Sequence, residues 1–192
     1  MKVLIVYTHP NPMSFNHAIL ETVRGELAKK NAHVKVKDLY AMKWNPILSG
    51  SDFEQMQAGK TLQDTAQEQA DVTWADTLVF IYPIWWFSHP AVLKGWIDRV
   101  FSFGYAYHMT ENGPSGLLAN KRAVVITTSG ADEKKAGQDG LLDAIETTMI
   151  KGILGFVGIT DARHKNFFAV PYVDDEARRK MLEDVKEYIA EI

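Results

Sequence analysis

Residues 78–90 constrain the fold of this chain more than any other stretch, because they join a buried strand to a cluster of aromatic residues. Residues 79–82 form an unbroken apolar run, which is typical of a parallel strand covered on both faces. Pro83 ends the strand because proline has no N–H to donate to the sheet. Residues 85–87, Trp-Trp-Phe, follow at once. Ligands of open parallel sheets bind at the carboxyl ends of strands, so we expect a flat aromatic ligand here. A core cluster or a dimer contact is the alternative.

Strand-like and helix-like segments alternate along the whole chain. The pattern predicts strands over residues 2–7, 34–38, 77–82, 121–128 and 159–169, and helices over residues 14–30, 65–74, 91–101, 141–155 and 174–192. This alternation predicts an α/β fold, a doubly wound five-stranded parallel sheet with helices on both faces. The second strand is more polar and suits an edge, whereas the first and third are the most apolar. The expected strand order is therefore 2-1-3-4-5, the flavodoxin-like order, with its switch point between strands one and three.

Composition and charge exclude several classes of function. With 192 residues, of which 46% are hydrophobic and 23% charged, the chain is expected to form a single domain over residues 1–192. A net charge of -3 argues against nucleic acid and anionic membranes as partners. The chain has no cysteine, which excludes disulfides and thiolate metal sites, and its six histidines lack metal-ligand spacing. Without a signal-like segment or an apolar run near ~20 residues, we expect no membrane span and a cytoplasmic location.

Two further strand ends are expected to meet the aromatic cluster at the switch point. Residues 8–16 form a turn-rich loop in which Ser14 can cap the next helix, and the free amide groups at such a helix start favour an anion. Residues 127–130, Thr-Thr-Ser-Gly, offer hydroxyl and backbone groups suited to the polar edge of a heterocycle. No G-x-G-x-x-G motif is present. Taken alone, residues 127–130 are better explained as an ordinary turn, and His9 as a loop residue with a local hydrogen bond. His164 is expected to be a polar strand or loop residue.

Six groups of residues, in this order and spacing, resemble the NAD(P)H:quinone oxidoreductase family, the flavodoxin-like flavoproteins of the DT-diaphorase and "modulator of drug activity B" type. They are His9 with residues 14–16; residues 38–42 with 45–47; residues 83–87; residues 93–96 with 99–101; residues 127–130; and residues 152–154 with Phe156 and Gly158. The resemblance covers most of the chain. It implies a single flavodoxin-like flavin-binding domain.

The resemblance also implies a function and a site. A flavin, FAD with FMN as the alternative, would pass two electrons from NADPH or NADH to a quinone, or to nitro and azo compounds, by a ping-pong mechanism in a homodimer. The implied flavin contacts are His9, Ser14, Phe15 and Asn16 at the phosphate and ribityl chain, Pro83, Ile84, Trp85, Trp86 and Phe87 around the isoalloxazine, Thr127, Thr128, Ser129 and Gly130 at the pyrimidine side, and Arg178 at the adenosine part. The implied substrate contacts are Trp86, Phe87, Tyr107 and Met109, with Trp85, Trp86 and Asp139 as catalytic residues.

The sequence departs from the family in the segment after residues 127–130. A tyrosine and a histidine that balance charge on the reduced flavin are missing, and Asp139 stands where the histidine would be. Backbone donors, Lys134 or Lys135 would then stabilise the reduced flavin. The runner-up function is a non-catalytic or electron-carrier flavodoxin-like protein, such as a regulatory subunit of a transport system. A carrier usually needs a strongly acidic docking face, and a net charge of -3 argues against one.

Overall fold

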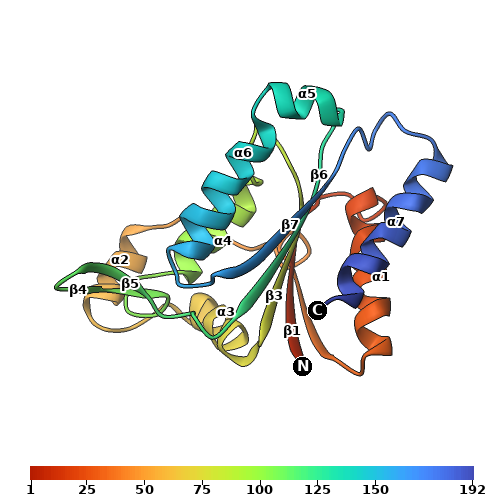
Figure 1. The fold of residues 1–192 in the computed structure, drawn as a ribbon. Coiled ribbons are helices and arrows are strands. Elements are labelled where there is room, and N and C mark those ends of the chain that lie inside the picture. Colours follow the sequence, from red (N-terminus) through yellow and green to blue (C-terminus); the bar gives the residue numbers. More distant parts are fainter.

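In the computed structural model, which describes residues 1–192, five parallel strands form one sheet in the order β2-β1-β3-β6-β7 (Figure 1). These are β1 (Lys2–Tyr7), β2 (His33–Asp38), β3 (Thr77–Pro83), β6 (Arg122–Thr128) and β7 (Asp161–Phe167). The predicted order is confirmed, with the polar second strand at one edge. Tyr7 pairs with Ile81 of β3, and Pro83 pairs with Thr128 of β6. The carboxyl ends of β1, β3 and β6 therefore meet at one edge of the sheet.

Helices cover both faces of the sheet, as the alternation of segments predicts (Figure 1). One face carries α1 (Phe15–Lys29) and α7 (Asp175–Ala190). The other carries α3 (Gln63–Trp74), α4 (Ala91–Val100), α6 (Leu141–Ile145) and the π-helix η1 (Glu146–Gly155), which continues α6. Residues 141–155 are helical as predicted, but their second part has the wider π geometry. None of the helices is long and apolar enough to cross a bilayer.

Alternating residues of the central strands supply two separate cores. Leu4 and Val6 point to the side of α3, α4 and η1, where they join Trp96 of α4 in one buried cluster. Val3 and Ile5 point to the other side and join the buried face of α1 and α7. Because successive side chains of a strand point to opposite faces, an unbroken apolar run is the pattern that two covered faces require.

Four short elements are absent from the sequence-based prediction. They are α2 (Gly50–Gln57), the antiparallel hairpin of β4 (Tyr107–Thr110) and β5 (Gly113–Gly116), and α5 (Glu133–Gln138). The sequence of β5 is Gly-Pro-Ser-Gly, which has no apolar alternation and low strand propensity. Its pairing with β4 is therefore decided by tertiary context and not by the local sequence.

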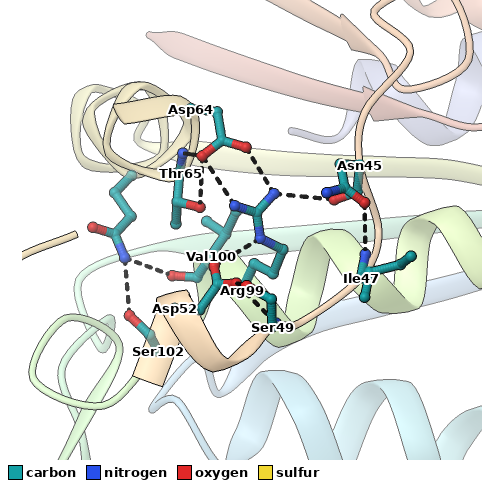
Figure 2. Close-up of polar contacts among 10 residues, drawn as sticks. Asn45, Ile47, Ser49, Asp52, Asp64, Thr65, Arg99, Val100 and Ser102 are labelled. Atoms are coloured by element: carbon teal, nitrogen blue, oxygen red, sulfur yellow. Dashed lines mark hydrogen bonds and ion pairs between the residues drawn. The ribbon is translucent and has the colours of Figure 1, made fainter. Parts of the chain in front are cut away.

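The long connection from β2 to α3 is attached to α4 by one buried arginine, Arg99 (Figure 2). Its guanidinium donates to Asp52 Oδ1 at 2.8 Å, to the carbonyl of Asn45 at 3.0 Å and to both carboxylate oxygens of Asp64 at 2.7 and 3.0 Å. Arg99 is only 4% exposed. Three separate parts of the chain thus converge on one side chain of α4. A guanidinium suits this place because it carries five donors in a fixed planar arrangement.

Candidate functional site

The aromatic residues after β3 form a tight turn with an unfavourable backbone. Trp85 and Ser88 exchange backbone hydrogen bonds of 3.0 and 3.1 Å, so the two residues between them form the turn. These residues, Trp86 and Phe87, have φ angles of 50° and 60°. The left-handed region costs an L-residue about 1–2 kcal/mol. Trp86 is also 97% exposed, so packing within this chain does not offset that cost. The core alternative for this cluster is therefore wrong, and the turn presents its rings to a ligand or to another molecule.

The loop before α1 is held by its own side chains. Ser14 Oγ caps the helix by accepting from the N–H of His17 at 3.2 Å. Asn11 Oδ1 accepts from the N–H of Met13 at 2.8 Å, and the Nδ1 atom of His9 accepts from the N–H of Asn11 at 3.0 Å. Burial lowers the pKa of His9, so its ring is neutral at pH 7. The loop is thus ordered while the start of α1 keeps its positive partial charge.

Asn16 carries an unpartnered donor at the same helix start. Its side chain is almost fully buried, with 3% of the residue exposed. Its Oδ1 atom accepts from Thr128 Oγ1 at 2.8 Å, which ties α1 to the end of β6. Its Nδ2 group has no hydrogen-bond partner. Because a buried N–H without an acceptor is unfavourable by about 1–3 kcal/mol, an oxygen of a bound ligand is the expected partner.

Two cavities at this edge of the sheet share part of their lining. The one beside α1, here called the polar cavity, measures about 470 Å³ and is lined by His9, Asn11, Ser14, Phe15, Asn16, Pro83, Ile84, Trp85, Thr128, Ser129, Gly130, Val170, Pro171 and Arg178. The one beside the turn, here called the aromatic cavity, measures about 580 Å³ and is lined by Ile84, Trp86, Phe87, Ser129, Gly130, Ala131, Asp132, Lys135, Ala136, Asp139, Leu141, Ala169 and Tyr172. Both include Ile84, Ser129 and Gly130. The cavities are therefore adjacent parts of one elongated site, each within the usual size of a ligand pocket.

The charges of the polar cavity favour an anion. No carboxylate lines this cavity, and its charged lining residue is Arg178. Arg178 donates to the carbonyl of Val170 at 3.3 and 3.2 Å and pairs with Asp175 at 2.9 Å. These bonds hold the guanidinium at the start of α7. Together with the positive end of α1, it makes this cavity suited to a phosphate group.

The aromatic cavity combines apolar rings with one ion pair and a second carboxylate, that of Asp132. Trp86, Phe87 and Tyr172 supply its aromatic lining, and Leu141 is among its aliphatic residues. Asp139 lines it as well, but its carboxylate lies 2.9 Å from Lys135 Nζ. This contact raises the pKa of Lys135, which stays charged at pH 7. The acidic group that the sequence places here is therefore offset by a cation one helical turn away.

The structure brings together most of the residues that the sequence selects. The lining of the two cavities includes Asp139 and all of the expected flavin contacts but Thr127. Thr127 is fully buried and points into the interface between β6 and β7, so a side-chain contact with a ligand is excluded for it. Tyr107 and Met109 belong to β4 of the β4–β5 hairpin, and neither lines a cavity of the site. Tyr107 packs instead on Phe156, with ring centroids 5.0 Å apart.

Sequence reasoning missed the loop after β7. Residues 169–172 supply Ala169 and Tyr172 to the aromatic cavity and Val170 and Pro171 to the polar cavity. Ala169 also has a φ of 51°, in the left-handed region. The signal was available, because a strand next to β6 in a parallel sheet ends at the same edge.

The fold and the cavities together define an open parallel α/β protein of the flavodoxin-like class, with an elongated candidate site at its switch point. A family model for the flavodoxin-like fold matches residues 1–189. The chain belongs to this family.

Several proteins of known name or structure are similar to this chain over most of its length. An uncharacterized NAD(P)H oxidoreductase of Haemophilus influenzae is 36% identical over 185 residues, which is 95% of this chain and 91% of the relative. The human ribosyldihydronicotinamide dehydrogenase [quinone] is 33% identical over 94% of this chain and 87% of its own. The solved NAD(P)H:quinone oxidoreductase of Methanothermobacter marburgensis is 30% identical, with a TM-score of 0.89 over 98% of this chain and 95% of that one.

Proposed function

We propose that this protein is a flavin-dependent NAD(P)H:quinone oxidoreductase, with residues 1–192 forming one flavin-binding domain. The observation that carries the proposal is the direct connection of an anion-suited cavity to an aromatic one at Ile84, Ser129 and Gly130. A flavin has the same division, since a phosphate-bearing chain joins a flat ring system. The quinone reductases among the similar proteins support the proposal.

The residues present fit a flavin. The unpartnered Nδ2 of Asn16 and the start of α1 would bind the oxygens of the phosphate and ribityl chain. Ser129 and Gly130, at the shared wall, would meet the polar edge of the ring. Trp85, Trp86 and Phe87 would enclose its flat part. We propose FAD, with Arg178 near the adenosine part, and FMN as the alternative.

The flavin would supply the electron transfer, accepting two electrons from NADPH or NADH and giving them to a quinone. The chain's own residues bind and orient the reactants. Trp86 and Phe87 offer flat apolar faces that exclude water and stack on either reactant. Because a nicotinamide and a quinone are both flat, one aromatic cavity would take them in turn. We therefore propose a ping-pong mechanism.

We further propose a homodimer in which the β4–β5 hairpin completes the site of the other copy. Tyr107 and Met109 lie outside both cavities of their own chain, and Met109 is exposed. A second copy is the simplest way for these residues to face a substrate. The cytoplasmic location stays a prediction from the sequence.

A visible spectrum of the purified protein tests the proposal most directly. We expect flavin absorption bands that bleach on anaerobic addition of NADPH or NADH and return on addition of menadione, with the released flavin identified by chromatography. A protein that binds neither FAD nor FMN would contradict the proposal. Bound flavin that does not bleach would favour the carrier or regulatory alternative.

Replacing Trp86 with alanine is expected to raise the flavin dissociation constant or the quinone KM by about fivefold, because aromatic stacking contributes about 1 kcal/mol. The matched variant Trp86→Phe keeps a ring at the same exposed position and is expected to stay within twofold of the parent. Fluorescence titration and steady-state kinetics measure the two constants. Unchanged values for the alanine variant would remove Trp86 from the site.

Replacing Asp139 with asparagine is expected to raise the midpoint potential of the bound flavin. The change removes the carboxylate that lies 2.9 Å from Lys135 Nζ and leaves Asp132 as the remaining carboxylate of this cavity that acts on Lys135. A nearby cation favours the more negative reduced state, by about 20 mV for an exposed charge. The control is Asp143→Asn, which removes the same charge from an exposed residue outside both cavities. Equal shifts of the midpoint potential in both variants would show that Asp139 does not lie closer to the flavin than an ordinary surface carboxylate.

A further inference from the structure

A chain of hydrogen bonds runs through the interface of β6 and β7 to the wall that the two cavities share. His164 Nε2 lies 2.8 Å from Thr127 Oγ1, which donates to Asn166 Oδ1 at 2.8 Å. Asn166 Nδ2 donates to Ser129 Oγ at 3.1 Å. The hydroxyl of Ser129 donates to the carbonyl of Ala131 at 3.2 Å. Ser129 lines both cavities, whereas His164 lines neither.

Hydrogen-bond donation runs in one direction along these residues, and it starts at the imidazole of His164. A threonine hydroxyl carries a single hydrogen, and Thr127 uses it on Asn166. The remaining contact with His164 therefore requires a hydrogen on Nε2. If Nε2 were bare, Thr127 would donate to it, the amide of Asn166 would reverse, and Ser129 would donate to Asn166. Its hydroxyl hydrogen would then face away from the cavities.

We propose that His164 is a positioning residue for the ligand site, which acts through Thr127 and Asn166 to hold the hydroxyl of Ser129 as a hydrogen-bond donor toward the cavities. The 3.2 Å bond to Ala131 is the longest of the chain, so a ligand acceptor can replace it. This inference rests on the proposed function for the identity of that acceptor, an oxygen or nitrogen at the polar edge of the flavin ring.

The surroundings of His164 favour the neutral form of its imidazole ring. Burial lowers its pKa to about 4, although Glu146 of η1 acts in the opposite direction. At pH 7 the ring is therefore neutral, and one of its nitrogens carries the hydrogen. Thr127 and Asn166 are both buried, so water does not compete for their hydroxyl and amide groups.

Nitrogen-15 NMR of the ligand-free protein tests the direction of the chain without any flavin. We expect the His164 ring to be the Nε2–H tautomer, with its signals assigned by their loss in His164→Gln. The Nδ1–H tautomer would overturn the proposal. This measurement stands whether or not the protein proves to be a quinone reductase.

A double-mutant cycle tests the effect on the site. Ser129→Ala removes the donor and is expected to weaken flavin binding by about fivefold, the effect of one hydrogen bond. His164→Leu removes the group that fixes the direction of donation, so the amide of Asn166 is free to reverse, and the loss of flavin binding is expected to be no larger than that of Ser129→Ala. The double variant is expected to bind no more weakly than Ser129→Ala alone, because His164 acts only through the hydroxyl that Ser129→Ala removes. His164→Gln, which places an amide N–H at a similar reach, is expected to restore binding to within twofold.

Each other outcome has a separate meaning. Independent, additive effects would overturn the proposal, as would unchanged flavin binding in His164→Leu. A lower melting temperature for His164→Leu with unchanged flavin binding would show that the residue only supports packing. If the parent protein binds neither flavin, the proposed function fails, and the NMR result alone decides the direction of the chain.

Discussion

Replacing Arg99 with methionine is expected to lower the free energy of unfolding by about 3–5 kcal/mol. The methionine keeps much of the apolar volume but leaves the largely buried carboxylate of Asp52 without its cation. Removal of one partner of a buried ion pair has this magnitude because the remaining charge stays away from water. The carbonyl of Asn45 and the carboxylate of Asp64 lose donors as well. Urea unfolding followed by circular dichroism measures the change.

Arg24→Met is the matched control for this substitution. Arg24 pairs with Glu21 at 2.8 Å, but both side chains are half exposed on α1. Exposed pairs of this kind contribute about 0.5 kcal/mol or less, so this variant should remain close to the parent. A loss for Arg99→Met as small as that of the control would show that the long connection does not depend on Arg99.

The contribution of Arg99 to the free energy of unfolding should also depend on pH. Hydrogen bonding to Arg99 lowers the pKa of Asp64 below its ordinary value of 3.8. The pKa of Asp52 is lowered too, since its bonds to Ser49 and Arg99 outweigh the opposing effect of burial. Lowered carboxyl pKa values add stability that is fully present above the unfolded-state pKa and is lost as pH falls through the folded value. The gap between parent and Arg99→Met should therefore be constant near neutral pH and shrink below about pH 4.

Replacing Gly95 with alanine is expected to destabilise the protein by about 3 kcal/mol. Gly95 lies in α4, where a Cβ atom would overlap the backbone and ring of Pro46 in the long connection. Backbone atoms cannot move aside as the end of a flexible side chain can, so either α4 or the connection must shift. Chemical denaturation measures the loss.

Gly25→Ala is the control, and its expected effect on stability has the opposite sign. Gly25 is also inside a helix, α1, but nothing lies within 4 Å of its would-be Cβ. Alanine at such a position stabilises a helix by about 0.5–1 kcal/mol because the unfolded chain loses less entropy on folding. Equal effects of the two substitutions would contradict the close packing of α4 on Pro46.

The central sheet was predictable because its signals are local. The apolar runs of β1 and β3 required two covered faces, and the polar β2 suited an edge, which was sufficient for the strand order. The aromatic turn was predictable for the same reason, since Pro83 ends the strand and the rings follow it directly. The cap at Ser14 likewise depends on neighbours within a few residues.

Other features depended on contacts between distant parts of the chain. Thr127 and Thr128 are adjacent and look alike in sequence, yet one faces β7 and the other faces α1 and the polar cavity. The loop after β7 joins the site only because β7 pairs with β6. Asp139 is offset by Lys135 only when α5 forms.

The sequence by itself therefore determined the fold class and the strand order, because burial periodicity and strand ends are encoded in neighbouring residues. Only the tertiary structure decided which side chains line the two cavities, which ones form the hydrogen bonds from His164 to Ser129, and how Arg99 holds the long connection. The physical reason is that a hydrogen bond or an ion pair depends on the position and direction of two groups, here often more than thirty residues apart.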